Sequence, residues 1–183
     1  MIGLAALRHL GAVLHPTRRY LAAAQLVSGA LELDRVAQPI MTASLSEAGH
    51  EVGAATEQLL KAVRTDNPTQ CAIAAAELTV AALRLSAELP DPFRISFDRA
   101  YLCVQEQAWA ELTAANEAHP RPWVSLHEGL GVVLEEVVEL GEAIDSGDTG
   151  QVRLEAIQVA AMGIRFLADL TPIRAGLMIR DVA

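Results

Sequence analysis

Apolar residues recur at helical spacing along most of this chain. One such series falls between residues 126 and 164: Leu126, Leu130, Val133, Val137, Leu140, Ile144, Leu154, Ile157, Ala161 and Ile164. Spacings of three and four residues place side chains on one face of an α-helix, whereas a half-buried strand alternates with a period of two. The pattern predicts helices at residues 18–36, 45–64, 68–89, 93–118, 126–145 and 150–170, with further helices at 1–14 and near 173–180.

Polar residues mark where several of these helices begin. Two Ser-x-x-Glu sequences precede apolar runs, and in such a capping box each side chain accepts from the backbone N–H of the other residue. They are Ser44 to Glu47 and Ser125 to Glu128. Asn67 before Pro68 predicts a capped helix start with proline in its first turn. Gly147 before Asp148 predicts the end of one helix and the cap of the next.

The chain contains an internal duplication. Aligned with itself at an offset of 81 positions, residues 18–89 match residues 99–170 at 17 of 72 positions without a gap. A gap-free register over three predicted helices indicates a repeat, and a repeat sets the architecture. We place copy one at residues 1–92 and copy two at 93–183. The matched pairs include Arg18 with Arg99, Tyr20 with Tyr101, Pro39 with Pro120, and Arg84 with Arg165.

The short links between helices predict antiparallel neighbours, so each copy offers a helical hairpin. Two hairpins related by a pseudo-twofold axis would close a four-helix bundle within one chain. We therefore expect an all-α fold, in which tandem duplicated hairpins form a four-helix-bundle core with additional helices.

Charge and composition limit the classes of partner that the protein can bind. The formal net charge is -9 and Lys61 is the single lysine, which argues against nucleic acid or anionic membrane as partners. A polyanionic small ligand remains possible if a cation bridges it to the protein. The sequence has no run long and apolar enough for a transmembrane helix and no basic leader, so we expect a soluble, cytoplasmic protein with Cys71 and Cys103 as free thiols.

Four acids stand out in copy two. Glu135, Glu136 and Glu139 fall within one helix, and Glu155 follows on the next helix across a tight turn. Glu136 and Glu139 are three residues apart and share a face, so Glu155 can face that pair. Converging carboxylates repel unless a cation lies among them, and oxygen ligands without His or Cys favour Mg²⁺ or Mn²⁺. The alternative is a solvated acidic helix face, the common outcome for a run of charges.

Copy one lacks these acids. The matching positions are Ala54, Ala55, Gln58 and Ala74. A generic solvated face would not lose its charges while the scaffold residues persist. The asymmetry fits a site kept in one copy, and both loss from copy one and gain in copy two are open.

The motifs resemble those of the MazG-like all-alpha nucleoside triphosphate pyrophosphohydrolase superfamily. Its pattern is E-E-x-x-E followed by E-x-x-D on the next helix, and this chain has E-E-x-x-E at 135–139 and E-x-x-Q at 155–158. The resemblance implies Mg²⁺ (or Mn²⁺) held by Glu136, Glu139, Glu155 and the residue at position 158. That residue is Gln158, which removes one charge from the family pattern.

The same resemblance implies a reaction and its participants. A nucleoside or deoxynucleoside triphosphate would be split into monophosphate and pyrophosphate, at one site per chain, with Glu135 orienting the water. The expected cations around the phosphates are Lys61, Arg165 and Arg174, with Arg64 and Arg180 as further candidates. Such bundles are usually built from two chains, so a homodimer is possible.

Other interpretations stay open. The chain can also be a non-catalytic helical module that keeps the fold and binds a nucleotide or a protein. Glu47 and His50 match the Glu-x-x-His of di-iron bundles, but copy two has Gly131 where His50 aligns. Trp109 and Trp123 can stack on a base, although core packing is the commoner role for such residues.

Overall fold

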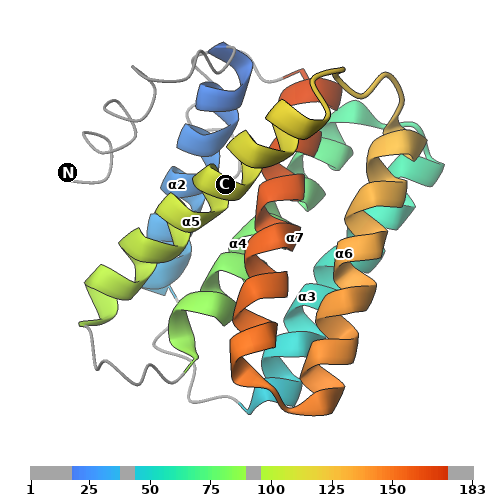
Figure 1. Cartoon of the computed structure of the whole chain (residues 1–183). Coiled ribbons are helices and arrows are strands. Elements are labelled where there is room, and N and C mark those ends of the chain that lie inside the picture. Colours follow the sequence, from blue (N-terminus) through green and yellow to red (C-terminus); the bar gives the residue numbers. More distant parts are fainter. Residues whose placement is uncertain (1–17, 38–43, 90–95, 173–183) are drawn as a thin grey trace.

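The computed structural model describes residues 18–37, 44–89 and 96–172, and in these residues it contains six α-helices and no strand. The helices are α2 (Arg18–Ala37), α3 (Leu45–Arg64), α4 (Pro68–Glu88), α5 (Phe97–Ala118), α6 (Leu126–Ser146) and α7 (Thr149–Leu170). The predicted all-α fold is confirmed (Figure 1). The helices predicted at 1–14 and 173–180 lie outside the described residues, as do Arg174 and Arg180.

The helices form three layers of two (Figure 1). In the middle layer α4 packs against α7. The α3–α4 and α6–α7 hairpins pack side by side and close a four-helix bundle, while α2 and α5 both cover the other face of α4 and α7. The bundle core thus comes from both copies of the repeat, as the hairpin argument predicted.

The middle layer is the most buried part of the described molecule. Small residues let α4 and α7 approach closely: a Cβ added at Gly163 would lie 2.2 Å from Thr79 Oγ1. α4 is the one described helix whose length and hydropathy would suit a membrane span, and 72% of that apolar window is buried inside the bundle. Most of this window therefore packs inside the bundle.

Most helix ends follow the predicted signals. Ser44 and Glu47 form the reciprocal capping box, Asn67 accepts from the Gln70 N–H, and Gly147 ends α6 with a φ of 74°. α5 begins at Phe97, four residues later than predicted, and α7 begins one residue earlier, at Thr149.

The second predicted capping box is only half right. Ser125 does accept from the Glu128 N–H, at 3.1 Å. The Glu128 carboxylate does not return to Ser125. It accepts instead from the Val124 N–H, at 2.8 Å, and from the guanidinium of Arg121. The Glu128 carboxylate therefore pairs with Arg121 and accepts from the N–H of Val124, one residue before the N–H expected for a capping box.

The helix bounds repeat with the offset of the duplication. α3 and α4 begin at Leu45 and Pro68, and α6 and α7 begin 81 residues later, at Leu126 and Thr149. Two buried tyrosines connect the copies: the Tyr20 hydroxyl donates to Asp169, and the Tyr101 hydroxyl donates to Glu88. Tyr20 matches Tyr101 and Glu88 matches Asp169 in the repeat, so the two bonds are equivalents of each other.

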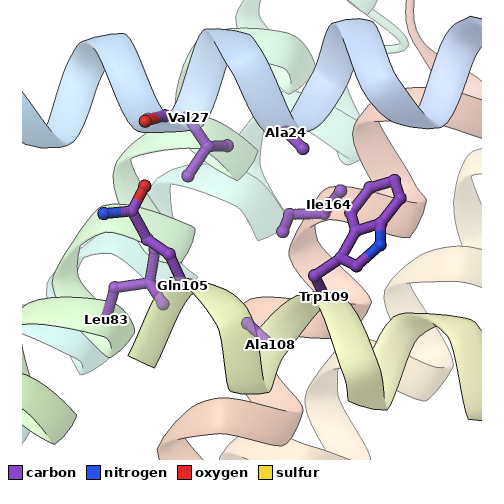
Figure 2. Close-up of a pocket in the computed structure, with 8 residues that line it drawn as sticks. Ala24, Val27, Leu83, Gln105, Ala108, Trp109 and Ile164 are labelled. Atoms are coloured by element: carbon purple, nitrogen blue, oxygen red, sulfur yellow. The ribbon is translucent and has the colours of Figure 1, made fainter. Parts of the chain in front are cut away.

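A small apolar pocket lies where the copies meet, between α2, α4, α5 and α7 (Figure 2). Its eight lining residues form four pairs that the 81-residue offset exchanges. The pairs are Ala24 with Gln105, Val27 with Ala108, Ser28 with Trp109, and Leu83 with Ile164. The pocket therefore marks the local symmetry axis, and its lining contains no ionisable side chain.

Candidate metal centre

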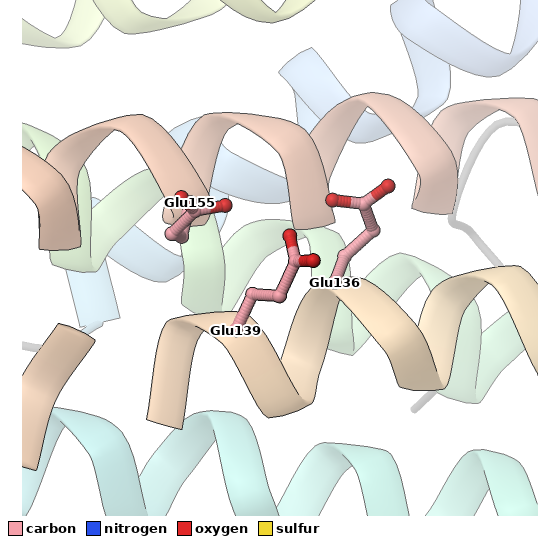
Figure 3. Close-up of side chains that lie close together, drawn as sticks. All are labelled: Glu136, Glu139 and Glu155. Atoms are coloured by element: carbon pink, nitrogen blue, oxygen red, sulfur yellow. The ribbon is translucent and has the colours of Figure 1, made fainter. Parts of the chain in front are cut away.

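Three glutamates converge between α6 and α7. Glu136 and Glu139 project from one face of α6, and Glu155 comes from the facing side of α7 (Figure 3). One carboxylate oxygen from each lies within 4.8 Å of the other two. The antiparallel hairpin produces this meeting, because the tight turn at Gly147 sets the pairing of the two helices. The predicted convergence of these three side chains is confirmed.

The three carboxylates differ in burial. Glu139 is exposed and Glu136 is half-buried, whereas Glu155 is only 6% exposed. The pKa of Glu136 is raised to about 7, mostly by burial and in addition by the charges of Glu139, Glu155, Glu135 and Glu111 in that order. Burial also raises the pKa of Glu155, as does the charge of Glu139, while a hydrogen bond from Gln151 opposes the shift. Without a cation, the cluster disfavours full ionisation.

Two side-chain oxygen atoms on α7 have no hydrogen-bond partner among the described residues. They are Oε2 of Glu155 and Oε1 of Gln158, and both are buried. Gln158 lies three residues after Glu155 on α7, so the two side chains share a face of the helix. A buried acceptor without a donor costs about 1–3 kcal/mol, more when it is charged. A cation held by the three glutamates would satisfy Oε2 of Glu155.

The donor set fits a hard divalent cation. All the candidate ligands are oxygens, which Mg²⁺ and Mn²⁺ prefer. Three oxygens bound to one octahedral Mg²⁺ include at least two pairs about 3 Å apart, so the glutamate side chains would have to move closer together than the present limit of 4.8 Å to hold an ion. Among the described residues, no ion pair joins an arginine or lysine to Glu136, Glu139 or Glu155. Within the described residues, no ion pair therefore balances the charge of the cluster.

Other predicted site residues are not in this group. Glu135 is exposed on α6, and its charge raises the pKa of Glu136 without joining the three converging oxygens. Lys61 and Arg64 are exposed in the last turn of α3, and neither forms an ion pair with the acids. Arg174 lies outside the described residues, so its role stays a prediction.

Arg165 does not fit its predicted role as a phosphate ligand. Its side chain is 3% exposed and lies ten residues beyond Glu155, about 15 Å along α7. Its guanidinium donates to the carbonyls of His119 and Arg121, at 2.7 and 3.1 Å, and stacks on Trp123. Pairing with backbone carbonyls makes Arg165 a structural residue.

The two tryptophans are core residues. Trp109 is buried beside the apolar pocket, and Trp123 is buried beneath Arg165. Neither ring is placed to stack on a base. Glu47 uses its carboxylate to accept from the backbone and hydroxyl of Ser44, which removes it from a di-iron motif with the exposed His50. Both cysteines are free, with Cys71 buried and Cys103 half-buried.

One acid near the cluster was missed from the sequence. Glu111 on α5 is half-buried, and its charge is among those that raise the pKa of Glu136. Copy one has Ala30 at the matching position, so Glu111 shows the same asymmetry as the other acids. That asymmetry was the available signal, although α5 carries no motif to single it out.

The chain was compared with protein families, curated proteins and solved structures. No protein-family model, no curated protein and no solved structure matches the chain. The function is therefore inferred from the carboxylate cluster itself.

Proposed function

We propose that this protein is a Mg²⁺-dependent nucleoside triphosphate pyrophosphohydrolase with one site per chain, in copy two. The observation that carries the proposal is the meeting of Glu136, Glu139 and the buried Glu155, with an unpartnered oxygen on Glu155. The likeness of E-E-x-x-E and E-x-x-Q to the MazG-like motifs supplies the reaction class. In that reaction, water and a nucleoside triphosphate give a monophosphate and pyrophosphate.

Each residue has a role in this proposal. Glu136, Glu139, Glu155 and the Gln158 amide oxygen would hold Mg²⁺ (or Mn²⁺), which when bound supplies the positive charge that a triphosphate needs near a carboxylate cluster. Glu135, exposed beside Glu136, would orient the attacking water and accept its proton. Lys61 and Arg174 are the basic residues that remain as candidates for the phosphates. A cytoplasmic location and a homodimer stay predictions.

A second function is favoured by a different observation. Gln158 stands where the family pattern has an aspartate, and the described residues bring no arginine or lysine to the acids by an ion pair. An active site for triphosphates usually has cations that balance the developing charge. The alternative is thus a helical module that binds a cation, and a nucleotide or protein through it, without turnover.

The test is pyrophosphate release from a panel of ribo- and deoxynucleoside triphosphates, with Mg²⁺, with Mn²⁺ and with chelator. We expect release that needs the cation and disappears in Glu155→Gln. Cation binding without any release would favour the binding module. Absence of both cation binding and release would reject the metal centre altogether.

A further inference from the structure

A buried carboxylate in copy two joins three separate segments of the chain. Asp169, near the end of α7, has a fully buried side chain. Its Oδ1 accepts from the hydroxyl of Tyr20 on α2, at 2.9 Å, and its Oδ2 accepts from the backbone N–H of Trp123, at 3.1 Å. Arg165 lies one turn earlier on α7, with Nε 3.6 Å from the same Oδ2. Asp169 therefore links α2, α7 and the segment before α6.

Arg165 fixes the same segment a second time. Its guanidinium donates to the carbonyls of His119 and Arg121 and lies 4.8 Å from the centre of the Trp123 ring. Hydrogen bonds from a buried charged donor are among the stronger ones in proteins. Residues 119–123 are thus bound to α7 through side chains of α7 itself.

This segment leads directly into α6. Four residues into that helix, Gly129 packs so tightly that an added Cβ would lie 2.4 Å from Leu170 and 2.9 Å from both Phe166 and Trp123. The start of α6 is therefore held against the end of α7, and the other end of α6 is held by the turn at Gly147. Between these two anchors lie Glu136 and Glu139.

The spacing of residues along α6 shows how a shift at the start of this helix would move the glutamates of the candidate metal centre. Along α6, Gly129 is about 27 Å from Gly147. Measured from the same glycine, Glu136 is about 16 Å away and Glu139 about 12 Å. If α6 pivots at Gly147, a shift of about 1 Å at Gly129 moves Glu136 by about 0.6 Å and Glu139 by about 0.4 Å. Glu155, on α7, does not move with them. Shifts of this size matter because metal ligands must be placed to a few tenths of an ångström.

We propose that Tyr20, Arg165 and Asp169 are positioning residues for the candidate metal centre, which they serve by fixing the start of α6 on α7. The proposal rests on the proposed cation binding by Glu136, Glu139 and Glu155. It also assigns copy one a part in the site of copy two, because Tyr20 belongs to α2. The hydroxyl of Tyr20 orients the carboxylate that holds the Trp123 backbone.

The repeat supplies a matched control. Tyr101 donates to Glu88 at 2.5 Å, and Arg84 Nε lies 3.4 Å from the same carboxylate. These residues are the repeat equivalents of Tyr20, Asp169 and Arg165. They stabilise the hairpin that has Ala55, Gln58 and Ala74 in place of the acids. Removing either tyrosine hydroxyl takes one donor from a buried carboxylate, but only one of these carboxylates supports α6.

The experiment compares Tyr20→Phe with Tyr101→Phe in the full chain. Mn²⁺ alone is the probe, with its dissociation constant measured by electron paramagnetic resonance and calorimetry. We expect Tyr20→Phe to weaken Mn²⁺ binding by about tenfold, and raised Mg²⁺ to restore pyrophosphate release. Tyr101→Phe should bind Mn²⁺ within about twofold of the wild type even where its loss of thermal stability is as large.

The outcomes separate the two proposals. If the wild type binds no Mn²⁺, the metal centre fails and the positioning role fails with it. If the wild type binds Mn²⁺ and the two phenylalanine variants bind it equally well, only the positioning role is overturned. Should Tyr20→Phe not fold, Asp169→Asn and Glu88→Gln give the same comparison.

Discussion

The α3–α4 and α6–α7 hairpins share a backbone plan but differ in their chemistry. Both begin with a serine cap, turn through a capped link and pack on the same partners. Where the second hairpin has Glu136, Glu139 and Glu155, the first has two alanines and a glutamine. The fold therefore does not need the acids. These are side chains that the fold can lose, yet they converge, and the charge of Glu139 raises the pKa of both Glu136 and Glu155, which is compatible with a cation site.

Other positions are identical in the two copies of the repeat. The positions that stay identical include the tyrosine and arginine of the buried networks, together with capping residues and core residues such as Leu59 and Leu140. These are fixed by packing and by hydrogen bonds that must be satisfied in the interior. A comparison within one chain thus separates residues that hold the bundle from residues available for chemistry.

The sharpest test of this difference is Glu139→Gln. We expect the variant to lose divalent-cation binding and any pyrophosphate release by at least about a hundredfold, because one of three charged ligands is gone. Without a cation the variant should be as stable as the wild type or more stable, by about 1 kcal/mol, since a repelling charge is removed. Thermal melting with and without Mg²⁺, beside a turnover assay, measures both effects.

Gln58→Ala is the control in the first hairpin. It occupies the position that matches Glu139 and has no carboxylate cluster around it, so it should change neither cation binding nor the Mg²⁺-dependent shift in melting temperature. A wild type that shows no such shift at millimolar Mg²⁺ or Mn²⁺ would remove the distinction between the hairpins.

A second test uses pH. In the metal-free folded protein the pKa of Glu136 is raised to about 7 from its ordinary value of 4.5, so the folded state binds the proton more tightly than the unfolded state. This group therefore contributes stability below about pH 4.5, and that contribution is lost as the pH rises through 7. We expect about 2 kcal/mol from a half-buried group.

The measurement is denaturant unfolding of wild type and Glu136→Gln between pH 5 and 8 in chelator. The wild type should lose stability relative to the variant as the pH rises. The same difference measured with saturating Mg²⁺ should shrink or reverse, because the cation competes with the proton for the carboxylate. A pH-independent difference in chelator would contradict the raised pKa.

The smallest expected effect comes from Gln158→Asp. This change restores the fourth acid of the family pattern at a position whose amide oxygen is buried and unpartnered. We expect Mn²⁺ affinity to rise by about tenfold and metal-free stability to fall by about 1 kcal/mol, since the new charge adds to the repulsion. Glu77→Asp, at the matching position in copy one, should leave cation affinity unchanged.

Most of the fold could be predicted from the sequence because the signals for helices are local. Helical periodicity, the caps at Ser44 and Asn67, and the repeat fixed helix order and nearly every boundary. The start of α5 was missed because Ser96, at its cap, makes no side-chain cap hydrogen bond and gave no comparable signal. The convergence of Glu136, Glu139 and Glu155 followed from spacing on a hairpin.

The rest depended on distant contacts. Arg165 was predicted to lie beside the phosphates, and nothing in its neighbours along the chain reveals the carbonyls of His119 and Arg121 to which it donates. Glu111 was missed for the same reason, because its relation to Glu136 arises only when α5 lies near the bundle. Which side chains meet across elements is decided by the packing of helices, and sequence periodicity predicts only the faces.

The bond between Tyr20 and Asp169 also has a consequence for how the protein folds. It joins residues 149 positions apart, and its counterpart joins Glu88 to Tyr101, just across the link between the copies. A chain emerging from the ribosome can form the second contact early, but the first must wait until almost all of α7 has been made. Closing so large a loop is entropically costly before the contact forms, which slows folding. Throughout synthesis α2 therefore has no partner for its buried tyrosine, and the completed bundle is reached only when the end of the last described helix meets the start of the first.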